Sequence, residues 1–167
     1  MLEIERKFLV RNTSWEEPVS SHRIEQGYLF IAADRTMRIR RSDGTYTLTL
    51  KVQAEGLARH EIETEIDAGK GQALLDGLCV KPPIRKTRHV VIHKNKTWEI
   101  DIFDGANAGL IVAEIELTSE DEAFERPRWI GPEVTDDSRF FNAALSGRPF
   151  SEWGLSYADL LAEITEG

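Results

Sequence analysis

The chain contains 167 residues, of which 41% are hydrophobic and 30% are charged. This composition is typical of a folded globular protein, and no apolar run approaches the length of a membrane-spanning helix. The net charge of −8 lacks the basic footprint of nucleic-acid-binding proteins, so we expect neither a nucleic-acid nor a membrane partner. The length suits one domain, which we predict to cover residues 1–167.

The start of the chain and its cysteine content indicate a reducing compartment. The first ten residues, MLEIERKFLV, alternate charged and apolar side chains from position 3 and lack the apolar core of a signal peptide. The single cysteine, Cys79, has no partner for an internal disulfide. We therefore expect a cytoplasmic protein.

A period of two dominates the hydrophobic pattern and predicts strands. In chain order, eight strands are expected at 2–10, 22–31, 36–41, 45–52, 59–67, 84–93, 97–104 and 110–118. The pair Asp43-Gly44 between the third and fourth strands is a strong hairpin signal.

Helical patterns occupy the longer connections and the C-terminal part of the chain. A helical turn is expected within 13–20 and a short helix within 119–126, where Ser119 and Glu122 have capping-box spacing. Longer helices are expected at 68–80, 136–146 and 155–165.

Alternate residues of a strand point to opposite faces, and nearly every predicted strand has one charged face. These faces carry Glu3, Glu5, Lys7, Arg38, Arg40, Lys51, Glu61, Glu63, Lys86, Arg88, Glu99, Asp101, Glu114 and Glu116. The simplest interpretation is a half-buried antiparallel sheet with its charged face in water. However, like charges two residues apart repel by about 2 kcal/mol at roughly 7 Å and an effective dielectric near 20. Bound metal ions and anions would remove this repulsion.

Closure of the eight strands into a barrel offers a second interpretation. The charged faces would then line the bore, and the apolar faces would point outward beneath the helices at 68–80, 136–146 and 155–165. Such a bore suits an extended polyanion together with its metal. We therefore predict a mainly β protein, an eight-stranded antiparallel closed barrel with a charged lumen and a few covering helices.

The segment Glu3-x-Glu5-x-Lys7 resembles the ExExK signature of CYTH-domain proteins, the triphosphate tunnel metalloenzymes. Further motifs are similar to the short bacterial members and occur in the family's order. They are Gln26-Gly27-Tyr28-Leu29, Arg38-Ile39-Arg40, Thr49-Leu50-Lys51, Arg59-x-Glu61-x-Glu63, Lys86-Thr87-Arg88, Asp101-Ile102-Phe103, Glu114-Ile115-Glu116 and Glu133-Val134-Thr135. The resemblance spans residues 2 to about 145.

The resemblance implies a role for each matching position. Cationic side chains would bind the triphosphate: Lys7, Arg38, Arg40, Lys51, Lys86 and Arg88. Carboxylates would bind Mg²⁺ or Mn²⁺: Glu3, Glu5 and Glu116 at one metal, with Glu61, Glu63, Glu114 and Asp101 as further ligands. The implied catalytic group, which positions a second metal or the attacking water, comprises Glu61, Glu63, Glu114, Lys86 and Arg88. No covalent nucleophile is required.

Two positions depart from the pattern of the short relatives. Phe141 stands where they commonly have a basic or small polar residue, and we expect Arg139 to replace that residue as a substrate-binding group at one end of the tunnel. Pro132 stands where a charged residue is usual.

The leading functional prediction is metal-dependent hydrolysis of inorganic triphosphate to pyrophosphate and phosphate. The alternatives are a class IV-type adenylate cyclase that makes cyclic AMP from ATP, a thiamine or nucleoside triphosphatase, and a polyphosphate-binding module without turnover. The expected partner is a small-molecule triphosphate, and the protein would act as a monomer or homodimer.

Overall fold

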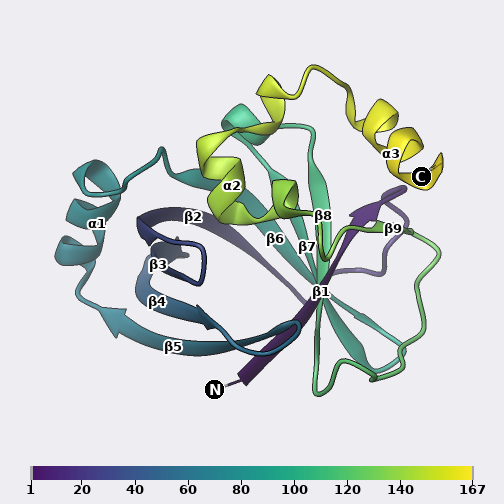
Figure 1. The fold of residues 1–167 in the computed structure, drawn as a ribbon, viewed down its shortest axis with the longest axis horizontal. Coiled ribbons are helices and arrows are strands. Elements are labelled where there is room, and N and C mark those ends of the chain that lie inside the picture. The colour runs from purple at the N-terminus through teal and green to yellow at the C-terminus, as the bar shows by residue number, and fades with distance from the viewer. Residues whose placement is uncertain (1, 167) are drawn as a thin grey trace.

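A computed structural model describes residues 2–166 and shows a closed antiparallel barrel of eight strands with one additional strand and three α-helices (Figure 1). The strands are β1 (Leu2–Val10), β2 (Ser20–Ile31), β3 (Arg35–Ser42), β4 (Thr45–Gln53), β5 (Ala58–Ile66), β6 (Ile84–His93), β7 (Lys96–Phe103), β8 (Ile111–Leu117) and β9 (Ile130–Glu133). The helices are α1 (Ala68–Gly77), α2 (Asn142–Gly147) and α3 (Tyr157–Glu166), with the short 3₁₀ turns η1 (Gly105–Asn107), η2 (Ser138–Phe140) and η3 (Phe150–Glu152). The eight predicted strands and the barrel are confirmed.

The barrel closes between the first and fifth strands of the chain. The strands follow the order β5-β4-β3-β2-β6-β7-β8-β1, and β1 pairs with β5 to complete the ring. This closure, called the seam below, pairs Leu2 with His60, Glu3 with Arg59 and Ile4 with Ala58. The C-terminal half of β1 leaves β5 and pairs instead with β9, a strand that the alternation pattern does not predict.

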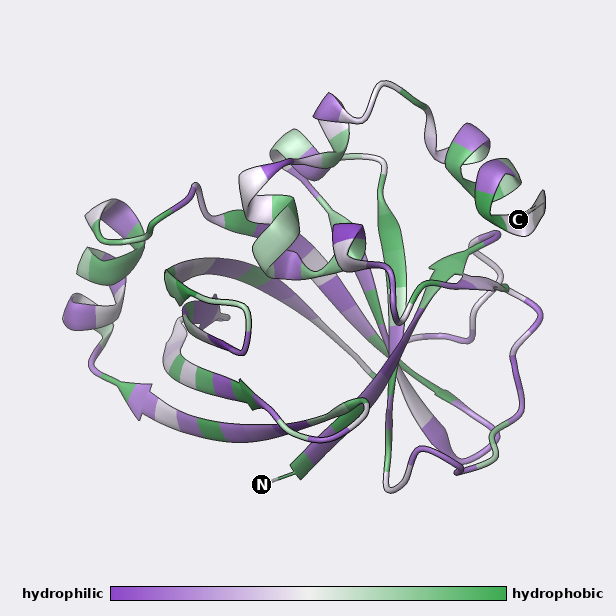
Figure 2. Cartoon of the chain, in the orientation of Figure 1, coloured by the Kyte–Doolittle hydropathy of each residue, from purple (hydrophilic) through white to green (hydrophobic). Residues whose placement is uncertain are grey.

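The predicted Asp43-Gly44 turn joins β3 and β4 as a two-residue hairpin. Both residues have positive φ, 49° and 92°, the conformation required by the turn that matches strand twist. Lys94 and Asn95 adopt the same conformation between β6 and β7. These turns set the register that directs alternate residues into the bore. Hydrophilic and hydrophobic residues alternate along several of the barrel strands (Figure 2).

Helix α1 covers the outer face of one half of the barrel, as predicted for residues 68–80. Leu75 packs with Ile39 of β3 and Tyr46 of β4 in one buried cluster. Its N-terminus is capped by Asp67, whose carboxylate accepts from the backbone N–H of Lys70 at 3.1 Å.

The C-terminal helices do not cover the outer face, so that part of the prediction is wrong. Their apolar side chains pack on residues with the same parity as the charged bore residues: Leu9 follows Lys7, Ile84 precedes Lys86, and Val112 precedes Glu114. This apolar plug, formed by Phe140, Leu145, Phe150 and Leu160 on Leu9, Ile84, Phe103 and Val112, fills one end of the bore.

The predicted helices at 13–20 and 119–126 are absent from the described structure, and the predicted helix at 136–146 is divided at Phe141 into η2 and α2. The two irregular segments instead bring aromatic rings onto the outer face of β1 and β6–β8. Phe124, from 119–126, lies 5.7 Å from Trp98 of β7, and Trp15, from 13–20, lies 6.4 Å from Trp129, which in turn lies 5.5 Å from Trp98 (distances between ring centroids). Burial of large aromatic rings here outweighs the local helical pattern.

Candidate functional site

The inward faces of the barrel strands enclose a cavity of about 530 Å³. Most of the predicted site residues line it: Glu3, Glu5, Lys7, Arg38, Arg40, Lys51, Glu61, Glu63, Arg88, Glu114 and Glu116. The strand register explains this convergence, because paired residues of neighbouring strands share a face: Lys7 pairs with Glu114, Glu5 with Glu116, and Lys51 with Glu61.

Three predicted residues do not line this cavity. Lys86 and Asp101 are fully buried behind it, next to the apolar plug. Arg139 is bound to Asp137, with Nη2 2.7 Å from Oδ2, and lies 3.6 Å from Glu163, so its guanidinium is not brought to the bore. The position of Arg139 gives no support to its predicted substrate role.

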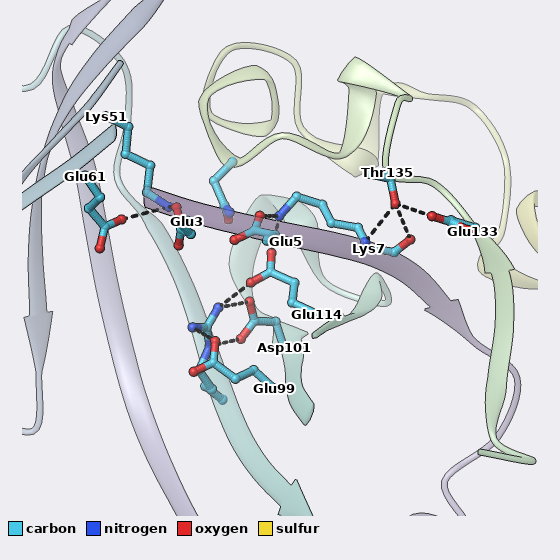
Figure 3. A network of polar contacts seen from close by, with 12 residues as sticks. Glu3, Glu5, Lys7, Lys51, Glu61, Glu99, Asp101, Glu114, Glu133 and Thr135 are labelled. Atoms are coloured by element: carbon cyan, nitrogen blue, oxygen red, sulfur yellow. Dashed lines mark hydrogen bonds and ion pairs between the residues drawn. The ribbon is translucent and has the colours of Figure 1, made fainter. Parts of the chain in front are cut away.

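Lys7 is the centre of a buried ion-pair network (Figure 3). Its ammonium group contacts both Glu5 and Glu114. Burial opposes the charged form of Lys7, but Glu114 and Glu5 outweigh it and raise the Lys7 pKa above its ordinary range. The same pairs act on Glu114: burial raises its pKa, whereas Lys7, Arg88 and Lys86 hold it well below the usual value. Both groups are therefore charged at neutral pH.

Asp101 neutralises two buried cations. Its Oδ1 accepts from Arg88 Nε at 2.7 Å, and its Oδ2 accepts from Arg88 Nη2 at 2.7 Å and from Lys86 Nζ at 2.5 Å. Arg88 also contacts Glu99 and, at 3.0 Å, Glu114. Burial lowers the pKa of Lys86 to about 8, with Asp101 opposing and Arg88 adding to this shift. Asp101 is thus committed to Arg88 and Lys86.

Two arginines of the bore stand apart from this network. Arg38 and Arg40 are absent from the ion pairs among residues 2–166, and Arg38 Nε is buried without a hydrogen-bond partner there. Within residues 2–166, the side chain of Arg40 makes one long hydrogen bond, 3.4 Å from its Nε to Gln26 Oε1. Burial, followed by repulsion from Arg38 and Arg88, lowers the pKa of Arg40 to about 10. An anion bound between the two guanidinium groups would relieve both burial and repulsion.

Around Glu116 the cavity has an excess of negative charge, the opposite of the excess positive charge at Arg38 and Arg40. Glu116 is exposed at the cavity, and its pKa is raised by burial of part of the side chain and then by Glu3, Glu99, Glu61 and Glu5. A cation held by these oxygens would remove the repulsion, and carboxylate oxygens are the donors that Mg²⁺ and Mn²⁺ prefer.

The carboxylates are held by lysines in the described structure. Lys51 Nζ lies 2.5 Å from Glu3 Oε2 and 3.0 Å from Glu61 Oε2. Among residues 2–166, no three Asp, Glu, His or Cys side chains already converge in the geometry of a metal site. The donor set has the chemistry for a hard divalent cation, and Lys7 and Lys51 pair with four of its members: Glu3, Glu5, Glu61 and Glu114.

Comparison with known proteins identifies this arrangement. The CYTH domain family matches residues 1–142. The chain belongs to the CYTH-domain family.

Two curated relatives align with this chain over most of their length. A protein of Acetivibrio thermocellus named inorganic triphosphatase is 39% identical over 151 residues, which cover 90% of this chain and 97% of that protein. A protein of Nitrosomonas europaea with the same name is 37% identical over 150 residues, which cover 87% and 97%. The crystal structure of an inorganic triphosphatase superposes with a TM-score of 0.65 and 34% identity, covering 86% of this chain and 93% of that one.

The CYTH cavity contains residues that the sequence prediction did not assign. Arg59 shares a strand face with Glu61 and Glu63, so parity alone could have placed it in the bore. Asn142 lines the cavity from α2, and its Oδ1 lies 3.4 Å from Lys86 Nζ. No periodicity signals Asn142, because only tertiary packing brings α2 to the barrel. No helix among the described residues has the length and hydropathy needed to cross a membrane.

Replacement of Asp101 should reveal how strongly the buried cations depend on it. We expect Asp101→Asn to lower the free energy of unfolding by about 3–5 kcal/mol, because it leaves Arg88 and Lys86 without full neutralisation. The double variant Asp101→Asn with Lys86→Met should recover part of this loss, since one buried cation is then removed. Urea unfolding at pH 7 measures both.

The matched control is Asp34→Asn, which breaks the exposed pair between Asp34 and Arg35. Its stability should equal that of the wild type, because exposed pairs contribute little. A loss for Asp101→Asn no larger than that of Asp34→Asn would contradict the assignment of Asp101 as the neutralising group.

Proposed function

We propose that this protein hydrolyses inorganic triphosphate to pyrophosphate and phosphate in a reaction that requires Mg²⁺ or Mn²⁺. The observation that carries the proposal is the pair formed by the buried Arg38 and the half-buried Arg40, which make no ion pairs among residues 2–166 and line a cavity that is also rich in carboxylates. The relatives named inorganic triphosphatase, at 37–39% identity, support the choice of substrate.

Arg38 and Arg40 form the proposed primary phosphate site. A guanidinium group presents N–H donors in a planar fork that matches two phosphate oxygens, and an anion there would satisfy the buried Arg38 Nε. Lys7, Lys51 and Arg88 line the same cavity and would contact the remaining phosphate oxygens when they exchange carboxylate partners for substrate. Lys86 lies behind them and would act by orienting Asn142 and Asp101.

Glu3, Glu5 and Glu116 are the residues proposed to hold the divalent cation. Their carboxylates lie on neighbouring positions of β1 and β8, with Glu5 directly opposite Glu116. A bound Mg²⁺ or Mn²⁺ would supply Lewis-acid polarisation of phosphoryl oxygens. The raised pKa of Glu116 supports this assignment, because repulsion among the surrounding glutamates is what a bound cation relieves.

Glu61, Glu63 and Glu114 are the proposed group that orients the attacking water. Glu63 Oε2 accepts from Thr49 Oγ1 at 3.0 Å, and Glu114 is fixed between Lys7 and Arg88, so each carboxylate has a defined direction. Cationic side chains on the non-bridging oxygens would offset charge as the terminal phosphoryl group is transferred to water and pyrophosphate leaves. Water attack needs no covalent intermediate.

The proposed setting is a cytoplasmic enzyme that acts as a monomer or homodimer, forms a single domain over residues 1–167 and binds neither nucleic acid nor membranes. The net charge of −8 and the single Cys79 support these expectations.

A substrate panel tests the proposed reaction. The purified protein is offered tripolyphosphate, ATP and thiamine triphosphate with Mg²⁺ or Mn²⁺, and products are separated by ion chromatography. We expect the highest kcat/KM with tripolyphosphate, equimolar pyrophosphate and phosphate as products, and loss of turnover in EDTA. Cyclic AMP as the main product from ATP would overturn the proposal in favour of a cyclase.

Glu5→Ala should abolish metal-dependent turnover while the protein remains folded, because it removes a proposed cation ligand and leaves Lys7 paired with Glu114. The measurement is activity over a titration of Mg²⁺ and Mn²⁺, together with the melting temperature. The matched control is Glu125→Ala, which removes an exposed carboxylate outside the barrel. Wild-type activity in Glu5→Ala would remove Glu5 from the site.

Arg40→Gln should weaken substrate binding without lowering stability. The lost charge-assisted hydrogen bonds correspond to a rise in KM for tripolyphosphate of about 10- to 100-fold. The stability should stay equal or increase, because the folded state no longer buries a cation whose pKa burial and neighbouring arginines depress to about 10. Unchanged KM together with the wild-type rate would refute this role.

A further inference from the structure

Arg59 of β5 lines the bore but, unlike the cations Lys7, Lys51 and Arg88, is not surrounded by ion-paired carboxylates among residues 2–166. Lys7, Lys51 and Arg88 each bind two or more carboxylates. Arg59 is absent from the ion pairs among residues 2–166, and its guanidinium carbon instead lies 5.3 Å from the centroid of the Phe141 ring. Within residues 2–166, no carboxylate forms an ion pair with this guanidinium, although it lines a cavity rich in charged side chains.

The position of Arg59 places it at a junction between two hollows. Arg59 and Phe141 line both the cavity of about 530 Å³ and an adjacent pocket of about 140 Å³. Glu3, Glu5 and Lys7 also line both. The Arg59–Phe141 pair therefore lies beside the proposed metal ligands, on the strand that completes the barrel seam.

Register also separates Arg59 from the primary phosphate site. Arg38 pairs with Thr49 of β4, whereas Arg59 pairs with Gln53 on the same strand, four residues further along. Lys51 lies between these two positions and faces the same cavity. The bore thus presents cations at successive levels, and an extended polyphosphate can contact all of them.

Phe141 gives the guanidinium a defined orientation. It precedes α2 with an extended backbone, and its neighbour Phe140 is anchored in the apolar plug. Stacking on a ring face leaves the N–H groups at the edge of the guanidinium plane free to donate. Holding the side chain in one orientation also reduces the conformational entropy lost when it binds a ligand.

We propose that Arg59 is a further substrate-binding residue that contacts a phosphate group of the bound triphosphate at the junction of the two hollows, and that Phe141 is its positioning residue. The proposal rests on the proposed function for the identity of the substrate. It assigns Phe141, the residue before α2, the role of orienting a cation that β5 supplies.

The test combines steady-state kinetics with direct binding. For Arg59→Gln we expect KM for tripolyphosphate to rise about 10-fold or more, with a smaller change in kcat, because charge-assisted contacts to substrate are lost. Arg59→Lys should recover part of the loss, since it restores the charge without the planar fork. Calorimetric titration with tripolyphosphate in EDTA should rank the proteins in the same way: the dissociation constant should be lowest for the wild type, higher for Arg59→Lys and highest for Arg59→Gln.

A double-variant cycle separates positioning from stability. Phe141→Leu keeps an apolar side chain and should raise KM by about 3-fold, whereas the pair with Arg59→Gln should be no weaker than Arg59→Gln alone. The matched control is Arg126→Gln, because Arg126 also lies over an aromatic ring, 5.0 Å from the Phe8 centroid, on the outer face. Its KM should equal the wild-type value.

Wild-type KM and dissociation constant in Arg59→Gln would overturn the inference while leaving the triphosphatase proposal intact. Additive effects of the two substitutions would overturn the positioning role of Phe141. If the wild type binds tripolyphosphate in an Arg59-dependent manner but does not hydrolyse it, the proposed reaction fails and the inference stands.

Discussion

Mutual neutralisation of buried charges is the constraint on which this barrel depends. A closed bore removes side chains from bulk water, and an isolated ion in such a place is strongly destabilising. The Lys7–Glu114, Arg88–Asp101 and Lys51–Glu61 pairs satisfy this constraint across strands that are neighbours in the ring. The strand register forms these pairs. A register shift of one residue in a strand would turn its charged side chains to the outer face and its apolar side chains into the bore.

The neutralisation is incomplete in two regions of opposite sign. Arg38 and Arg40 repel each other and have no ion-paired carboxylate in the described part of the chain, while Glu116 faces several other glutamates. A scaffold optimised for stability alone would not retain both imbalances. A ligand consisting of a polyanion and a divalent cation complements both at once, which links the energetics of the unliganded barrel to the chemistry proposed for it.

The apolar plug sets the length of the bore. Beyond Lys7, Lys86 and Glu114, the inward positions become Leu9, Ile84 and Val112, and they pack on side chains from the C-terminal part of the chain. The plug therefore lies directly against the buried Lys86–Asp101 pair and excludes water from it. The same C-terminal segment contributes Phe141 and Asn142 to the cavity wall, so one end of the bore depends on packing between distant parts of the chain.

The sequence by itself determined the strands and most of the inward residues. A period of two divides Glu3, Glu5 and Lys7 from Leu2, Ile4 and Phe8, and this division holds whatever partners the strand acquires. Tertiary structure decided the rest: that Asp101 serves Arg88 and Lys86, that Arg139 turns to Asp137, and that Arg59 stacks on Phe141. It also decided that the C-terminal helices fill the bore end instead of covering the outer face. Local periodicity specifies which face of an element is apolar, but only long-range packing determines what that face meets.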